Sequence, residues 1–188
     1  MIQEFKNEPI MDINIEANRR AMLEAIANVE GRPAPHVPLL IGGREIRTAD
    51  EFPSLNPSDP SQIVGWASTA TAEHADQAVQ AAAAAFPAWS RTSFDSRARI
   101  LLRAASIMRR RRCELNAVEI LEAGKPWLEA DGDVAEAIDF LEFYAREAFR
   151  YGGIQPVTIL PGEDDAVSYI PTGVTVGSTA RTGSTSTV

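Results

Sequence analysis

Apolar residues recur at helical spacing near the start of the chain. They are three or four residues apart, as on one face of an α-helix: Met22, Ala25, Ile26 and Val29. The pattern predicts an amphipathic helix over residues 12–30 that ends at Gly31. The stretch GRPAPHVP then predicts an extended connector, because each proline lacks an amide donor and restricts the residue before it.

Short apolar runs separated by turn residues follow this connector. Gly42 and Gly43 lie between two such runs in PLLIGGREIR, a pattern typical of a hairpin whose two-residue turn needs positive φ. FPSLNPSDPSQIVGWAS predicts another pair of strands, with a turn at residues 56–60 and a second strand over 62–67. Two final strands are predicted over residues 155–160 and 167–176.

The middle of the chain has strong helical character. Thr71 is a suitable N-cap for a helix that stops near Pro87, where the chain loses an amide donor. The alanine run at residues 81–85 indicates that this helix packs closely against a neighbour rather than forming a low-complexity segment. The sequence therefore predicts a closely packed helix directly after the strands.

Two further helical stretches follow. Ser93 is a suitable N-cap for the first, which ends at Gly124 and leaves room for breaks inside it. The second is predicted over residues 128–151, before Gly152 and Gly153. No internal repeat accompanies this order of elements.

Composition and charge narrow the class of protein. The chain has 188 residues, is 45% hydrophobic and carries a formal net charge of -8, which fits one domain, or one domain with a piece of another. An acidic chain has little attraction for nucleic-acid phosphates or anionic membranes. No segment has the apolar length of a signal peptide or a transmembrane span. With a single cysteine as well, the expected protein is soluble and cytoplasmic.

Most candidates for chemistry favour a structural interpretation. The run Arg109–Arg112 points around the whole helix, so a solvated, salt-bridged turn is preferred to an anion site. Adjacent arginines favour a thiolate at Cys113, yet no histidine lies near it in the sequence, so a packing cysteine is preferred. His36 and His74 have no metal-ligand spacing. No metal is therefore expected.

The predicted helix over residues 128–151 is different because it is apolar on two sides. One stripe contains Val134, Ile138, Leu141, Ala145 and Ala148. The nearly opposite stripe contains Glu136, Phe140, Phe143 and Glu147. Such a helix is expected to lie between two neighbours, which leaves Glu136 in partly apolar surroundings where a carboxylate needs a cation. Glu136 is therefore a candidate for binding an ammonium group, with an exposed or lysine-paired glutamate as the alternative.

Several segments together resemble the N-terminal part of the aldehyde dehydrogenase superfamily. They are FKNEPI, LIGGREI, SLNPSDPSQIVGWAS, AAFPAW, RARILLRAASIMRRRRCEL, EAGKPWLEADGDVAEAIDFLEFYAREAFRY and PGEDDAVSYIPTGVTV. NEPI and DVAEAIDF with PGEDD are most similar to the branch that oxidises L-glutamate γ-semialdehyde, also called 1-pyrroline-5-carboxylate dehydrogenase. The resemblance covers residues 4–176.

The resemblance implies a fold and an activity. Members have an α/β fold in which a Rossmann-like domain binds NAD, a second domain carries a nucleophilic cysteine, and a β-rich flap joins subunits. In this branch the small-molecule substrate is oxidised to glutamate in proline catabolism. Only Glu136 falls on a position associated with the substrate, namely with its amino group. Residues 1–176 are expected to supply helices of the NAD-binding domain, flap strands and the first strand of the Rossmann-like sheet.

The end of the chain departs from the family pattern. Members continue PTGVTV into an apolar segment with Pro-Trp-Asn, whereas nine of the twelve residues from Gly177 to Val188 are Gly, Ser or Thr. Residues 177–188 are expected to be disordered, since they offer little apolar surface. The nucleophile, the general base and most of the cofactor site lie beyond this point in members. No catalytic or NAD-binding residue is therefore assigned, and the chain alone is not expected to catalyse the reaction.

Two other functions remain open at this stage. One is a non-catalytic helical module that binds a partner, such as a full-length dehydrogenase subunit, through the retained strands. The other is a fragment of a different aldehyde dehydrogenase, with the same chemistry and another substrate. In addition, the chain is expected to form an oligomer through its strands.

Overall fold

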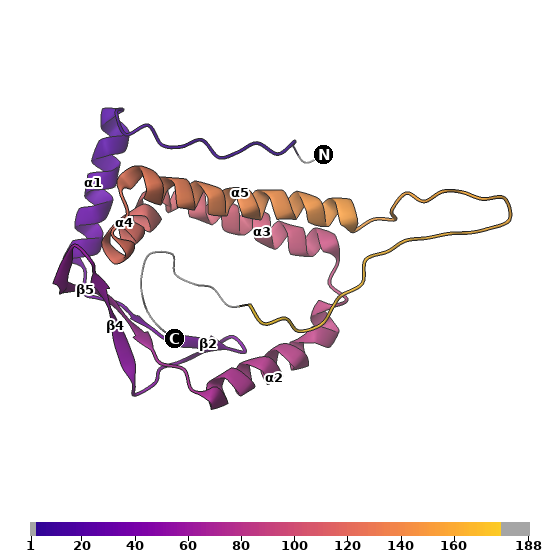
Figure 1. Ribbon diagram of the computed structural model, residues 1–188, viewed down its shortest axis with the longest axis horizontal. Helices are drawn as coiled ribbons and strands as arrows, with labels where there is room; N and C mark the ends of the chain where they lie inside the picture. Colours follow the sequence, from indigo (N-terminus) through magenta and orange to yellow (C-terminus); the bar gives the residue numbers. More distant parts are fainter. Residues whose placement is uncertain (1–2, 178–188) are drawn as a thin grey trace.

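The computed structural model describes residues 3–177, which form a helical body beside a small β-rich part (Figure 1). The helices are α1 (Glu16–Gly31), α2 (Ala72–Trp89), α3 (Phe94–Arg110), α4 (Arg112–Ala123) and α5 (Trp127–Tyr151). The strands are β1 (His36–Val37), β2 (Leu39–Ile41), β3 (Arg44–Ile46), β4 (Glu51–Asn56) and β5 (Asp59–Ser68). None of the described helices is both long enough and apolar enough to cross a bilayer.

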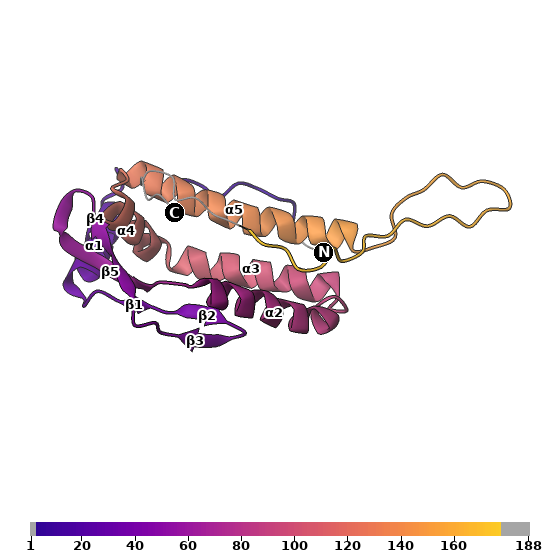
Figure 2. The same cartoon turned by 60° about the horizontal axis from the view of Figure 1, so that its bottom comes forward.

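The core consists of two clusters of apolar side chains, one between α3 and α5 and the other between α1 and α4. Helices α3 and α5 run side by side along their length (Figures 1 and 2), and their apolar faces enclose Ala105, Val134 and Ile138. A second cluster joins α1 to α4 through Val29 and Leu121. These contacts confirm the predicted inner stripe of α5 and place that helix against the body on one side.

The start of α1 differs from the predicted start. The helix begins at Glu16 rather than Asp12, because the Asp12 carboxylate accepts the backbone amide of Asn14 at 2.9 Å and holds a turn before the helix. At the other end Gly31 is still helical, and the chain leaves the helix through the extended residue Arg32. The predicted end of the helix at Gly31 is thus confirmed.

Helix α2 confirms its predicted start and corrects its predicted end. The Thr71 hydroxyl accepts the amide of His74 at 3.4 Å, while the His74 ring accepts the amide of Thr71 at 3.1 Å. The helix continues through Pro87 to Trp89. Pro87 lies in the last turn, where few residues follow it and the loss of one backbone hydrogen bond is tolerated.

The alanine run of α2 does not pack as predicted. No residue of this helix is buried in the described part of the chain. Ala81 lies close to the β2–β3 hairpin, where a Cβ added to Gly42 would lie 3.6 Å from the Cβ of Ala81. Figure 2 shows α2 near the β2–β3 hairpin, and Figure 1 shows it set apart from α3. The predicted close packing is not present in residues 3–177, because the side chains of α2 there are exposed or only half-buried.

Helices α3 and α4 confirm the expected cap, break and stop. The Ser93 hydroxyl accepts the amide of Ser96 at 3.2 Å, and the helical run breaks at Arg111, where φ is -102° and ψ is 14°. Gly124 ends α4 with a φ of 68°. A Cβ on Gly124 would also lie 2.8 Å from Pro57, so this position requires glycine for its conformation and for its space.

The β-rich part confirms the two predicted hairpins and adds one pairing. Gly42 and Gly43 have φ values of 57° and 77°, as a two-residue turn between β2 and β3 requires. Strands β4 and β5 pair antiparallel. Residues 36–37, predicted only as connector, form β1 and pair parallel with β5, which gives the sheet order β1-β5-β4. The extended backbone that the prolines impose allows this pairing.

The two predicted final strands are absent from the described residues 154–177. One isolated antiparallel bridge joins Gln155 to Val167, and the segment extends beyond the end of α5 (Figure 1). A strand needs a neighbour that accepts and donates its backbone hydrogen bonds, and within residues 154–177 that pairing is limited to the Gln155–Val167 bridge. The tail predicted to be disordered lies, from residue 178 onward, outside the described residues.

Candidate functional site

The outer face of α5 forms one wall of an open depression of about 260 Å³. The helix contributes Glu136, Asp139, Phe140, Phe143 and Tyr144. Residues 3–11, called the strap below, contribute Phe5 and Asn7 to the same depression. Carboxylates and aromatic rings thus meet in one hollow, although the two segments that supply them are far apart in the sequence.

Glu136 is exposed at the edge of this depression. In residues 3–177 it has neither a hydrogen bond nor an ion pair. The expectation of a helix held between two neighbours is wrong for this side, since Phe140 beside it is 51% exposed. The apolar outer stripe has no covering layer in the described chain, so Glu136 keeps an uncommitted carboxylate.

The aromatic side chains next to Glu136 pack against one another. Phe140 and Tyr144 stack with their ring centroids 6.0 Å apart, and Phe143 meets the edge of Tyr144 at 5.5 Å. Phe5 of the strap meets Phe143 edge-on at 5.6 Å. Aromatic faces attract ammonium and guanidinium groups, and a nearby carboxylate adds charge attraction. The depression is therefore suited to a small organic cation or to the ammonium end of a zwitterion.

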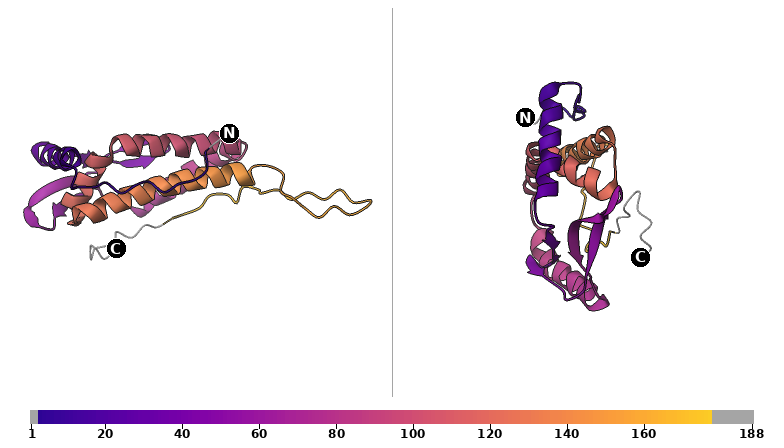
Figure 3. Two further views of the ribbon diagram at one scale, coloured as in Figure 1. Left: turned by 90° about the horizontal axis from the view of Figure 1, so that it is seen from above. Right: turned by 90° about the vertical axis from the view of Figure 1, so that its left-hand side faces the viewer.

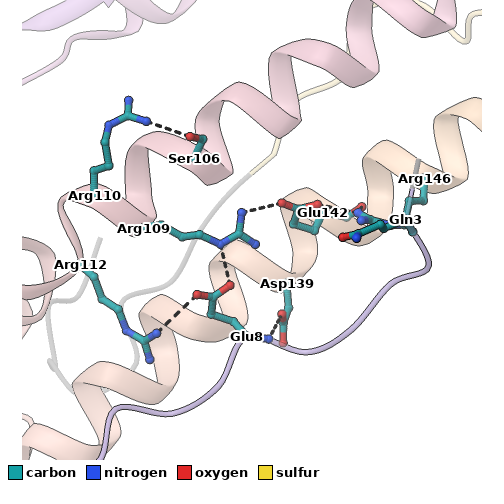
Figure 4. A network of polar contacts seen from close by, with 9 residues as sticks. All are labelled: Gln3, Glu8, Ser106, Arg109, Arg110, Arg112, Asp139, Glu142 and Arg146. Carbon is teal, nitrogen blue, oxygen red and sulfur yellow. Dashed lines mark hydrogen bonds and ion pairs between the residues drawn. The ribbon is translucent and has the colours of Figure 1, made fainter. Parts of the chain in front are cut away.

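The strap is held by Asp139, which sequence reasoning missed. Its carboxylate accepts the side-chain amide of Asn7 at 2.7 Å and the backbone amide of Glu8 at 2.6 Å. At the start of the strap, Arg146 donates to the carbonyl of Gln3 at 2.9 Å. Figure 4 shows the contact of Asp139 with Glu8 and places Gln3 next to Arg146. One signal was available in the sequence: Asp139 lies one helical turn after Glu136 and hence on the same side of the helix.

Glu8 links the strap to α3 and α4. Its carboxylate lies 2.7 Å from Arg109 and 3.6 Å from Arg112, and Figure 4 shows it between the two guanidinium groups. Arg109 also reaches Glu142 of α5 at 2.7 Å. Burial acts to raise the pKa of Glu142, but hydrogen bonds from Arg146 and Arg109 outweigh it and hold that pKa below its ordinary value. The arginine run therefore ties three elements together.

The predicted salt-bridged turn at Arg109–Arg112 is confirmed, but its predicted solvation is wrong for Arg112. This side chain is only 12% exposed and makes two hydrogen bonds of 2.6 Å to Asp131 of α5. Arg110 and Arg111, by contrast, bind the neighbouring side chains Ser106 and Glu114 at the surface. Arg109 and Arg112 thus share Glu8, whereas Arg110 and Arg111 bind other partners, because the side chains leave the backbone in different directions.

Asp131 is fully buried, and no pattern in the sequence indicated its importance. It accepts from Arg112, from the amide of Asn116 at 2.9 Å and from the backbone amide of Met11 at 2.6 Å. Burial acts to raise the pKa of its carboxyl, but these hydrogen bonds together hold the pKa below its ordinary value of 3.8. The end of the strap is thereby fixed to the core.

The remaining candidates have structural surroundings. Burial, followed by the charge of Asp131, raises the pKa of the Cys113 thiol, which agrees with a packing cysteine and opposes a thiolate. His74 belongs to the α2 cap, and His36 lies 2.8 Å from Glu51. Within residues 3–177 no three acidic, histidine or cysteine side chains are grouped as metal ligands.

The strand–turn–helix arrangement that usually binds a dinucleotide is not seen in residues 3–177. A glycine-rich turn between a parallel strand and a helix N-terminus is the usual cradle for a pyrophosphate. The parallel pair in residues 3–177 joins β1 to β5, and no helix lies between a glycine turn and either strand in that manner.

Comparisons with known proteins agree with the architecture. The model of the family described as "Aldehyde dehydrogenase family" matches residues 45–180. The chain is 46% identical over 176 residues to the 1-pyrroline-5-carboxylate dehydrogenase of Geobacillus sp. (strain WCH70), covering 94% of this chain and 34% of that protein.

Solved structures give the same relationship. The 1-pyrroline-5-carboxylate dehydrogenase from Thermus with bound NAD superposes with a TM-score of 0.86 at 46% identity, covering 90% of this chain and 33% of that one. Proline utilization A from Bdellovibrio bacteriovorus gives a TM-score of 0.82 at 41% identity, covering 85% of this chain and 17% of that one. The chain thus spans about a third of the length of its curated relatives. Its sequence and its fold place it in the aldehyde dehydrogenase family, as a part that corresponds to the N-terminal portion of 1-pyrroline-5-carboxylate dehydrogenases.

Proposed function

We propose that this chain is part of an NAD-dependent L-glutamate γ-semialdehyde dehydrogenase, which oxidises its substrate to glutamate in proline catabolism. The observation that carries the proposal is 46% identity over nearly the whole chain to a 1-pyrroline-5-carboxylate dehydrogenase. A TM-score of 0.86 to the Thermus enzyme of that name supports it. In this proposal catalysis requires the remainder of such an enzyme, because the family resemblance places the nucleophile, the general base and most of the cofactor site beyond this part.

The proposed contribution of this chain to substrate recognition is Glu136. Its carboxylate binds the ammonium group of the substrate at the edge of the aromatic depression. Three features support this role: the carboxylate is exposed, it has no partner in residues 3–177, and Phe140 lies beside it. An aldehyde without an amino group would gain nothing from this carboxylate.

The proposed assembly is an oligomer in a cytoplasmic setting. Exposed apolar side chains after α5, such as Ile159 and Ile170, support pairing of this segment with further chain in a complete enzyme or subunit. The same surface favours the second candidate function, a non-catalytic module that binds a full-length dehydrogenase subunit. The single cysteine is consistent with a reducing compartment.

Completion of the chain tests the proposal. Residues 1–176 are joined to the remaining two thirds of the Geobacillus relative, and NADH formation is measured with glutamate semialdehyde and with propanal. The completed protein is expected to oxidise the semialdehyde with the higher kcat/KM, and the 188-residue chain alone is expected to form no NADH above a heat-killed control. NADH from the chain alone, or a preference for propanal in the completed protein, contradicts the proposal.

The partner-module alternative predicts a different result. If the chain acts through a full-length subunit, the unmodified chain should form a stoichiometric complex with the intact Geobacillus enzyme. Sedimentation of a mixture of the two purified proteins measures this directly. Two independent species favour the enzyme-part proposal.

A further inference from the structure

The depression beside Glu136 is built from two segments rather than from the helix alone. The outer surface of a single helix is convex, so α5 cannot enclose a ligand by itself. Phe5 and Asn7 of the strap form the facing wall. Removal of the strap would leave the aromatic rings and Glu136 on an open surface.

The strap has no helix or strand that would fix its position. Side-chain contacts along its length determine its place: Arg146 holds the carbonyl of Gln3, Asp139 holds Asn7 and the backbone amide of Glu8, Arg109 and Arg112 pair with the Glu8 carboxylate, and Asp131 holds Met11. The Asp139 contact is the one within the depression. Phe5 and Asn7 therefore take their positions from Asp139 more directly than from the two outer contacts.

Asp139 and Glu136 differ in their hydrogen bonding although both carboxylates lie on the outer face of α5. Asp139 accepts two short hydrogen bonds, at 2.6 and 2.7 Å, which occupy both of its oxygens. Glu136, one turn earlier, accepts none within residues 3–177. An incoming ammonium group would therefore meet one committed carboxylate and one available carboxylate, which fixes where it binds.

We propose that the strap is a specificity-determining wall of the Glu136 depression and that Asp139 is the positioning residue that holds this wall. The depression then binds the α-ammonium end of an amino acid. Phe5 forms the wall that faces the aromatic rings of α5, and the Glu136 carboxylate attracts the ammonium group. This inference rests on the proposed ammonium-binding role of Glu136. It goes further, because it assigns a task to the first residues of the chain.

Two measurements on the 188-residue chain test the inference. The first is amide hydrogen exchange at Glu8 in the native chain, in Asp139→Asn and in Asp133→Asn. The substitution Asp139→Asn replaces one acceptor oxygen with an amide nitrogen that faces a donor, so exchange at Glu8 is expected to accelerate at least about tenfold. Asp133, on the same helix, binds Lys125 and not the strap, so its variant is the matched control and should leave Glu8 unchanged.

The second measurement uses L-glutamate as the ammonium probe and glutarate as the control that lacks the amino group. Chemical shifts of the Phe140 and Tyr144 amides are followed during titration. The native chain should respond to L-glutamate only, Glu136→Gln should abolish the response, and Asp139→Asn and Phe5→Ala should each weaken it several-fold. Asp133→Asn should respond like the native chain.

The outcomes separate this inference from the proposed function. No response of the native chain to L-glutamate overturns the ammonium role of Glu136 and the ligand assigned here. A native response that Asp139→Asn and Phe5→Ala leave unchanged overturns the strap as a wall, while the role of Glu136 stands. Unchanged exchange at Glu8 in Asp139→Asn overturns Asp139 as the residue that holds the strap. Asn7→Ala, which removes one strap contact and keeps the helix intact, repeats this test should Asp139→Asn fail to fold.

Discussion

The strap and the segment after α5 are both irregular, yet they differ in what holds them. Figure 3 shows the strap alongside α5 and the other segment extending away from the body. The strap bonds to side chains of the helical body, namely Asp131, Asp139, Arg109 and Arg146. The later segment is rich in apolar side chains, and its only bridge among the described residues joins Gln155 to Val167.

This comparison shows that polar contacts of an irregular segment with a helical body define its position, whereas a strand-like sequence does not. Backbone groups of the strap meet carboxylates directly, so they need no neighbouring strand. Ile159 and Ile170 are 87% and 80% exposed, which fits a sequence suited to a sheet that residues 3–177 do not contain. Substitutions at the contacts that hold the strap should therefore lower the stability of the fold, whereas substitutions in the segment after α5 should hardly change it.

Arg112→Met should have the largest effect, because it leaves the buried Asp131 carboxylate without its cation. The expected loss is about 3–5 kcal/mol in the free energy of unfolding. Urea unfolding followed by circular dichroism measures it. Arg110→Met is the matched control, since the polar partner of Arg110 within residues 3–177 is Ser106 at the surface, and its effect should stay within about 0.5 kcal/mol. Equal effects of the two substitutions would refute the importance of the buried pair.

The second-largest effect is expected from acid, which should lower the free energy of unfolding by protonating the carboxylates that hold the strap and its arginines. The pKa values of Asp131 and Glu142 lie below their ordinary values of 3.8 and 4.5, so the folded state binds these two protons less readily than the unfolded state. Their contribution is present above about pH 4.5 and is lost as the pH falls through the lower folded pKa values. The urea midpoint should thus be level near neutral pH and fall below about pH 4.

Asp131→Asn supplies the control for this pH dependence. Asparagine cannot titrate, so the variant should start less stable and lose less stability on acidification than the native chain. Parallel pH profiles for the native chain and the variant would mean that Asp131 does not contribute to the acid response.

Substitutions after α5 should have the smallest effect on folding. Ile159→Ser and Ile170→Ser remove exposed side chains, so the free energy of unfolding should change by less than about 0.5 kcal/mol. The same changes should reduce self-association in sedimentation velocity, because they remove apolar surface. A loss above about 1 kcal/mol would mean that this segment packs against the body, and the contrast with the strap would fail.

Signals from residues close together in the sequence were sufficient to predict several helix ends and one turn. Thr71, Ser93 and Gly124 act through neighbours within four residues, so their roles as caps follow from the sequence itself. The Gly42–Gly43 turn is local in the same sense. The family resemblance and the inner stripe of α5 were likewise accessible, since each depends on residue pattern alone.

Contacts between residues far apart in the sequence could not be predicted from local patterns. Asp139 meets Asn7 across 132 positions, and Met11 meets Asp131 across 120, with no periodicity that pairs them. The exposure of Glu136 was also misjudged, because a second apolar stripe does not reveal whether another layer covers it. For the same reason the strands predicted after α5 lacked a partner.

The most direct test of the account is the discrimination shown by Glu136→Gln in the chain completed with the Geobacillus remainder. Glutamine keeps the shape and removes the charge, so kcat/KM for glutamate semialdehyde should fall by an amount equivalent to about 1.5–3 kcal/mol. Propanal, which has no ammonium group, should be oxidised almost as before. An equal loss for both aldehydes would show that Glu136 is structural or acts in catalysis generally, and would contradict its role in binding the substrate's ammonium group.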